Sequence, residues 1–152
     1  MCIRDRIGQY AHGNEPSHHI AHLYNYVGQP WRTQEIVDEV LHTLYFNNPD
    51  GLSGNEDCGQ MSAWYILNAM GFYQVCPGKP VYSIGRPLFN EATVHLKDGK
   101  SFKVIAHNNS RDNKYVRSIV LNGNKLETPF FTHQDIVDGG TLELTMGSEP
   151  LK

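Results

Sequence analysis

The pattern of apolar and polar positions changes near residue 75 of this 152-residue chain. Before that point apolar residues recur at the three- and four-residue spacing of amphipathic helices. After it they stand in short β-type runs between glycine-containing turns. We therefore expect an α+β fold, with three helices in residues 7–75 and an antiparallel β-rich part in residues 76–152.

Three helical segments are expected in the first part. The first covers about residues 16–27 and ends at Gly28, since Pro suits a first helical turn and Gly a helix end. The second starts near Thr33, and the breaker cluster at residues 47–51 ends it. The third covers about residues 59–70, and its mostly apolar or small side chains predict burial on most sides.

Turn signals divide the second part into strands. Asp98-Gly99 and Asn122-Gly123 each predict a hairpin, because these dipeptides readily adopt positive φ angles. The stretch from Thr132 to Asp135 is interpreted as a plain connection before the last strand. Strands are expected at residues 92–96, 102–106, 116–121 and 141–146.

Composition excludes several classes of function. A net charge of −3 without any cluster of Lys and Arg gives no electrostatic basis for binding nucleic acid. No apolar run reaches the length of a membrane span. Cys2, Cys58 and Cys76 are odd in number and lack metal-type spacing, so they predict neither a disulfide framework nor a zinc site.

The most informative motif is Gly54-Asn55-Glu56-Asp57-Cys58-Gly59, which leads into the third expected helix. A carboxylate at a helix N-terminus is held ionised by the helix dipole and the backbone N–H groups. That position suits a general base, a ligand of sugar hydroxyls or a metal ligand. The alternative is a simple N-cap cluster, because acids are common at helix starts.

A second Gly-Asn-acid turn, Gly13-Asn14-Glu15, enters the first expected helix. Together with Gly28-Gln29-Pro30-Trp31-Arg32-Thr33-Gln34, the two turns closely resemble glycoside hydrolase family 92. Members of that family are calcium-dependent exo-acting α-mannosidases that invert the anomeric centre. The resemblance runs in order from about Ile7 to the C-terminus.

The resemblance implies that the chain is the C-terminal fragment of a longer enzyme. In the family an N-terminal β-sandwich is joined to an (α/α)6 barrel, and residues 7–75 resemble the last helices of that barrel. We therefore expect exposed apolar surface and poor solubility in isolation. Residues 1–6 fit neither the family nor a signal peptide, and we interpret them as a non-native remnant.

The resemblance also implies catalytic roles. Asp57 matches the general base of the family, and Asn55 stands where the family often has a helper acid. Glu56 is the fallback base. The general acid is expected upstream of Ile7, so the fragment alone should be inactive.

Binding roles follow in the same way. Asn14 and Glu15 are expected to contact mannose hydroxyls or the calcium ion, with Glu15 as the metal ligand. His18, Glu56 and Trp31 are further candidates for the sugar pocket. The implied partners are mannose-containing glycans and the upstream part of the same enzyme. The implied location is periplasmic or extracellular.

Other interpretations remain open from the residues. The chain could be a non-catalytic carbohydrate-binding or accessory module. His18 and His22 lie four residues apart, and with Glu15 they could form a zinc site. His18 and Trp31 could equally be core residues.

Overall fold

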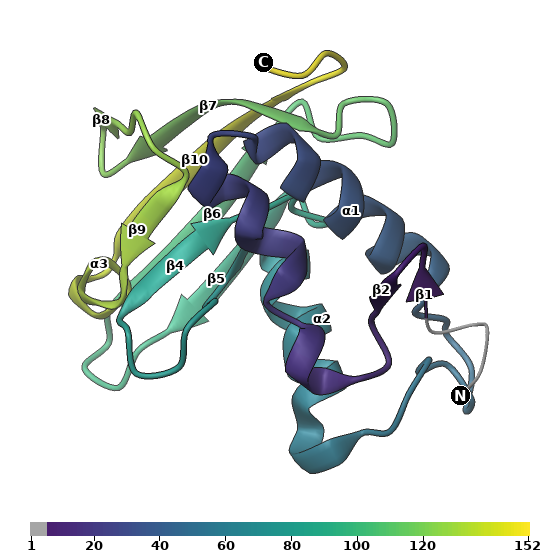
Figure 1. Ribbon diagram of the computed structural model, residues 1–152. Helices are drawn as coiled ribbons and strands as arrows, with labels where there is room; N and C mark the ends of the chain where they lie inside the picture. Colours follow the sequence, from purple (N-terminus) through teal and green to yellow (C-terminus); the bar gives the residue numbers. More distant parts are fainter. Residues whose placement is uncertain (1–5) are drawn as a thin grey trace.

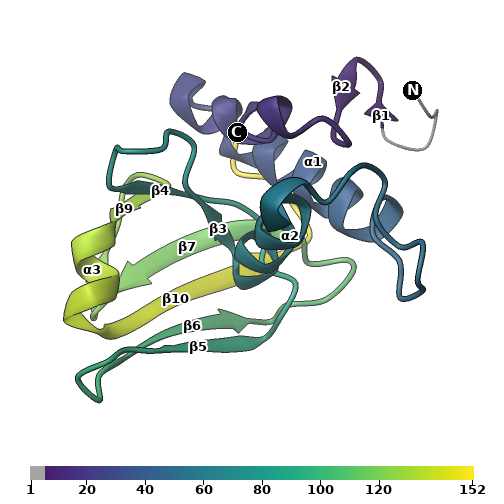
Figure 2. The same cartoon turned by 90° about the horizontal axis from the view of Figure 1, so that it is seen from below.

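The computed structural model describes residues 6–152 (Figure 1). The expected non-native segment lies outside the described residues except for Arg6, which begins strand β1 (Arg6–Ile7). Strand β1 pairs with β2 (Tyr10–Ala11). Figure 2 shows the strands β4–β7, β9 and β10 on one side of the molecule and helices α1 and α2 on the other.

The three expected helical segments are present. The first is formed by two 3₁₀ helices, and its end at Gly28, with a φ angle of 73°, is confirmed. The second starts slightly earlier than expected, because Pro30 occupies the first helical turn. The segments are η2 (Glu15–Ser17), η3 (Ile20–Val27), α1 (Pro30–Thr43), η4 (Asp57–Gly59) and α2 (Gln60–Met70).

Two sheets follow. A three-stranded antiparallel sheet has the order β3-β4-β9, and a five-stranded sheet has the order β5-β6-β10-β7-β8. Both expected hairpins, at residues 98–99 and 122–123, are confirmed. The strands are β3 (Phe72–Tyr73), β4 (Val81–Ile84), β5 (Glu91–His95), β6 (Ser101–His107), β7 (Tyr115–Leu121), β8 (Asn124–Lys125), β9 (Phe130–Thr132) and β10 (Gly140–Gly147).

The larger sheet corrects the expectation of a purely antiparallel arrangement. Strand β10 lies parallel to β6, with Gly140 opposite Phe102, and antiparallel to β7. The helix α3 (His133–Asp138) returns the chain to the end of the sheet at which β6 begins. The expected plain connection at Thr132 is in fact the capping box of this helix, since Thr132 and Asp135 cap each other reciprocally.

Two clusters of buried apolar side chains form the core. One lies on the sheets around Phe102, Phe131 and Leu142. The other lies between η3, α1 and α2, around Val37 and Trp64. Leu67 of α2 packs against both clusters, so the helical and β-rich parts share one interior.

Several large apolar side chains are exposed. Ile20, Leu23 and Tyr26 follow one another every third residue of η3 and therefore share one face of this 3₁₀ helix. In α2, Ile66 is 51% exposed, so the expectation that this helix is buried on most sides is wrong for one face. Among the described residues no helix has the length and apolar content needed to cross a membrane.

Candidate functional site

The two Gly-Asn-acid turns meet at their glycines. A β-carbon added to Gly54 would lie 2.5 Å from the carbonyl oxygen of Gly13 and 2.7 Å from its Cα. Such distances are far below van der Waals contact, so only glycine fits at residue 54. The backbone contact brings together two motifs that are about forty residues apart in the sequence, and it places Asn14 and Glu15 beside the turn of Asp57.

The turn that contains Asp57 has an unusual backbone. Cys58 has a φ angle of 53° and Gly59 of 78°, and a left-handed conformation is uncommon for a residue such as Cys. The N–H of Gln60 donates to the carbonyl oxygen of Asp57. Asp57 is the residue directly before this bend, and its side chain is exposed.

Glu56 caps helix α2. Its carboxylate accepts hydrogen bonds from the N–H of Ser62 at 3.1 Å and from the Oγ–H of Ser62 at 2.6 Å. Glu56 therefore satisfies a backbone N–H in the first turn of α2, although the N-cap residue of this helix is Gly59. Asp57 and Asn55 are exposed, and within residues 6–152 the Asp57 carboxylate has no hydrogen-bond or ion-pair partner. No described protein group therefore occupies the Asp57 carboxylate oxygens.

Two buried polar atoms lie beside the contact of the glycines without a hydrogen-bond partner in residues 6–152. They are Oε1 of Glu15 and Oγ of Ser53, the residue before Gly54. A buried oxygen without a partner is costly unless a ligand satisfies it. Glu15 therefore suits a sugar hydroxyl or a hard cation, and Ser53 is a candidate that the sequence did not indicate.

A pocket of about 400 Å³ opens next to the capped end of α2. Ser62, which donates to Glu56, forms part of its wall. The other lining side chains are mainly aromatic or apolar, and they come from the loop that follows α1 and from α2. They include Tyr45, Phe46, Leu52, Tyr65 and Ile66.

The expectation that His18 contacts the sugar is not supported by its surroundings. The ring is 1% exposed, and burial lowers the pKa of its imidazole. Its Nε2 lies 3.0 Å from the carbonyl oxygen of His12, and its Nδ1 lies 3.2 Å from Nε2 of Gln60. Both ring nitrogens are used inside the protein, so His18 is a core histidine behind the site.

His12, which the sequence did not single out, stacks on His18 with ring centroids 4.7 Å apart. Its Nε2 lies 2.7 Å from the hydroxyl of Tyr45, which donates to the carbonyl oxygen of Met61. Tyr45 therefore accepts from Nε2–H, and Nδ1 of His12 accepts from Tyr10 at 2.8 Å. Desolvation lowers the pKa of His12 to about 3, so the ring is neutral.

The alternative of a zinc site is not supported. His22 Nε2 donates to Oδ1 of Asn68 at 2.8 Å, and its Nδ1 lies 3.1 Å from Oγ of Ser83. Neither His18 nor His22 has a free ring nitrogen. No group of three or more His, Cys, Asp and Glu side chains suited to a metal ion occurs in the part of the chain that the structure describes.

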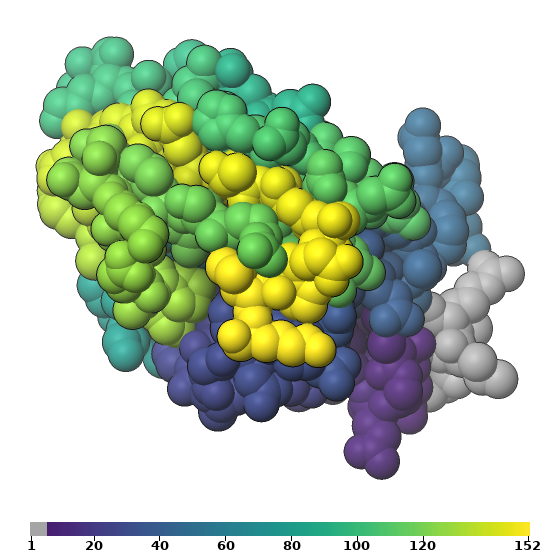
Figure 3. Space-filling view, turned by 90° about the horizontal axis from the view of Figure 1, so that it is seen from above, coloured from purple at the N-terminus to yellow at the C-terminus, as the bar shows by residue number. Residues whose placement is uncertain are grey.

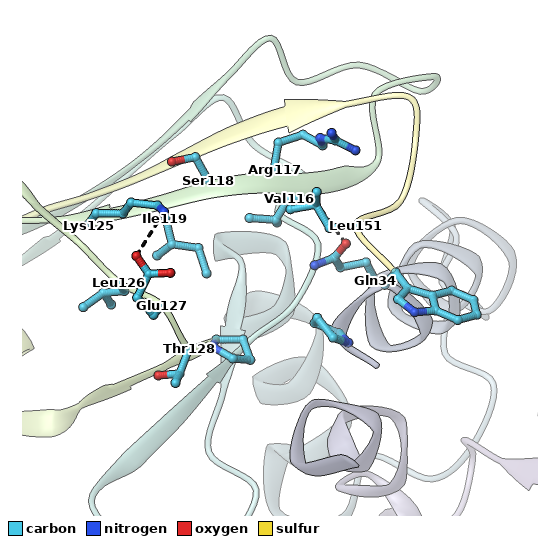
Figure 4. A pocket seen from close by; sticks show the side chains of 13 residues that line it. Gln34, Val116, Arg117, Ser118, Ile119, Lys125, Leu126, Glu127, Thr128 and Leu151 are labelled. Atoms are coloured by element: carbon cyan, nitrogen blue, oxygen red, sulfur yellow. Dashed lines mark hydrogen bonds and ion pairs between the residues drawn. The ribbon is translucent and has the colours of Figure 1, made fainter. Parts of the chain in front are cut away.

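Trp31 does not lie with the other expected site residues. It stands at the start of α1, and twelve residues of helix, about 18 Å, separate it from the end that approaches the site. It lines a smaller pocket of about 190 Å³ between α1 and β7, where Gln34 accepts from the N–H of Val116 (Figure 4). The C-terminal residues cover this region in Figure 3, and Lys152 Nζ lies 5.8 Å from the ring centroid of Trp31.

Comparisons with known proteins identify relatives along almost the whole chain. The model of the glycosyl hydrolase family 92 catalytic domain matches residues 2–148. An uncharacterized secreted glycosidase of Arthroderma benhamiae is 31% identical over 140 residues, which are 90% of this chain and 18% of that protein.

Solved structures agree with this match. The α-mannosidase BT3965 of Bacteroides thetaiotaomicron is 46% identical, with a TM-score of 0.93 over 97% of this chain and 20% of that one. The inverting mannosidase BT2199 of the same bacterium is 50% identical, with a TM-score of 0.87 over 94% of this chain and 19% of that one. The chain thus spans about a fifth of the length of these relatives. It belongs to glycosyl hydrolase family 92.

Proposed function

We propose that this chain is the part of an exo-acting α-mannosidase that carries the general base and some of the contacts to the sugar. The observation that carries the proposal is the contact between Gly13 and Gly54, which joins the two motifs of the family resemblance into one site. Support comes from the relatives, two of which are described as an α-mannosidase and an inverting mannosidase.

In the proposed reaction Asp57 takes a proton from a water molecule that attacks the anomeric carbon from the face opposite the leaving group. Its free carboxylate, exposed on a turn at a helix start, suits this role. Asn55, also exposed and two residues earlier, would orient the water through its amide. Inversion needs a second carboxyl group about 6.5–9.5 Å away, and we assign this acid to a part of the enzyme outside this chain.

Asn14 and Glu15 are assigned to the mannose hydroxyls, and Glu56 is a further acceptor at the rim of the site. Calcium would bind Glu15, because Oε1 of Glu15 is a buried carboxylate oxygen without a protein partner. Calcium requires six to eight oxygen ligands. The remaining ligands would be waters, carbonyl oxygens and groups beyond these residues. When bound, the ion would engage two sugar hydroxyls and favour a distorted ring.

The test compares the kcat and KM of variants of the complete enzyme. The substrate is a mannobiose, in which one mannose is α-linked to the other. Asp57→Asn should lower kcat by about 10²–10⁴-fold with little change in KM, since it removes proton transfer and not binding. Glu15→Gln should raise the calcium concentration needed for half-maximal activity. An Asp57→Asn enzyme with nearly wild-type kcat would refute the proposed role of the base.

The secreted relative supports a location outside the cytoplasm. We propose that the enzyme acts on glycans in the periplasm or the medium. Fractionation of the source cells, with an antibody against this chain, tests that location.

A further inference from the structure

A hydrogen bond between side chains joins the two turns of the site. Nε2 of Gln60 lies 3.2 Å from Nδ1 of His18. On one side, the backbone N–H of Gln60 donates to the carbonyl oxygen of Asp57. On the other, the backbone N–H of His18 donates to the carbonyl oxygen of Glu15 at 3.0 Å. Asp57 is therefore linked to Glu15 by a chain of hydrogen bonds that passes through Gln60 and His18.

The directions of these bonds are fixed by their acceptors. The carbonyl oxygen of His12 can only accept, so Nε2 of His18 carries the hydrogen, and Nδ1 of the neutral ring is an acceptor. Gln60 uses one amide hydrogen for this Nδ1 and the other for the hydroxyl oxygen of Tyr73 at 3.1 Å. These hydrogen bonds therefore require the tautomer of His18 that carries its hydrogen on Nε2.

The backbone of His18 is held by a further hydrogen bond. The indole N–H of Trp64 donates to the carbonyl oxygen of His18 at 3.1 Å. Trp64 is fully buried, and it belongs to α2, the same helix that Gln60 begins. Because His18 is held at its ring, its N–H and its carbonyl oxygen, a shift of Gln60 would be transmitted to the turn of Glu15.

We propose that His18 and Gln60 are a positioning pair, which sets the separation between the Asp57 carboxylate and a sugar held at Asn14 and Glu15. The inference rests on the proposed function. In this proposal the two side chains act on the distance between the two turns and not through contact with the substrate. Their effect arises because a misplacement of about 1 Å between a catalytic group and its substrate can cost on the order of 100-fold in rate.

Two amide variants of one residue test the pair. In His18→Asn the amide oxygen takes the place of Nδ1 and still accepts from Gln60. In His18→Gln the amide nitrogen takes the place of Nε2 and donates to His12, while Gln60 loses its partner. We expect kcat of the complete enzyme on α-linked mannobiose to be at least about tenfold lower in His18→Gln, with KM changed less than about threefold.

Two further variants separate positioning from folding. Gln60→Met, which keeps the length of the side chain, should match His18→Gln in kcat. His22→Asn perturbs an equally buried histidine that bonds to Ser83 and Asn68, and its kcat should stay at the wild-type level below its melting temperature. The melting temperature of every variant is measured alongside.

Equal kcat in His18→Asn and His18→Gln overturns the proposal, as does a loss of kcat that merely follows the melting temperature across all variants. Asp57→Asn is included in the same assay. If it keeps wild-type kcat, the proposed function fails and the positioning pair with it. If it loses kcat while the two His18 variants remain equal, only the positioning pair is refuted.

Discussion

Acidification should destabilise the helical core because it contains histidines held neutral. His12 and His22 are both fully buried, and desolvation lowers their pKa to about 3 and about 4. In the unfolded chain a histidine has a pKa of about 6.5. The unfolded state therefore binds protons as the pH falls through 6.5, whereas the folded state binds them only near pH 4 and below. The stability that the two neutral histidines contribute is fully present above pH 6.5. As the pH falls it is lost down to about pH 4 for His22 and about pH 3 for His12.

The magnitude follows from the linkage relation. At pH 5, which is 1.5 units below the unfolded pKa and above both folded values, each histidine lowers the free energy of unfolding by about 2 kcal/mol. The two together contribute about 4 kcal/mol, which is a large fraction of the stability of a small domain. Urea unfolding at pH 7.5 and pH 5 measures the difference, and the fluorescence of Trp64, whose ring lies 4.3 Å from that of His12, reports the transition.

A variant isolates one of the two contributions. His22→Asn should be less stable than the wild type at pH 7.5, because it loses the hydrogen bond to Asn68, but it should lose about 2 kcal/mol less on going to pH 5. His95→Asn, at an exposed position, should keep the wild-type pH dependence. A wild-type chain equally stable at both pH values, or a His22→Asn chain with the wild-type pH dependence, would show that burial does not hold these histidines neutral.

Three substitutions test other features of the structure. Gly54→Ala should lower kcat/KM of the enzyme at least tenfold and stability by about 1–3 kcal/mol, because its β-carbon would overlap the backbone of Gly13. Gly99→Ala, strained by a φ angle of 80° in an open hairpin, should cost about 1 kcal/mol and leave activity intact, and equal activities in both variants would contradict the contact. Asp38→Asn should destabilise by about 3 kcal/mol in urea unfolding, since Nε of the buried Arg86 lies 3.0 Å from its Oδ1, and a cost below about 1 kcal/mol would argue against a structural ion pair.

Local features of the fold could be predicted from the sequence because their causes are local. The hairpins at residues 98–99 and 122–123 and the end of α2 at Gly71 each depend on residues that accept a positive φ angle. The capping box between Thr132 and Asp135 is equally local, and its three-residue spacing could have revealed helix α3.

Features that depend on distant residues could not be predicted. The parallel pairing of β10 with β6 joins segments nearly forty residues apart, and no local pattern specifies it. The two Gly-Asn-acid motifs are evident in the sequence, but the contact between Gly13 and Gly54 appears only in the folded chain. For the same reason His18 resembled a pocket residue, since its partner Gln60 follows 42 residues later.

The role of Asp57 as general base is tested most directly by chemical rescue of Asp57→Ala in the complete enzyme. Without the base, water is not activated, but azide needs no activation and can attack the anomeric carbon from the vacated side. We expect a nearly inactive variant whose turnover rises with azide and whose product, identified by NMR, is β-mannosyl azide, inverted from the α-linked substrate. Wild-type turnover without azide, or a folded variant that forms no β-mannosyl azide, would contradict it.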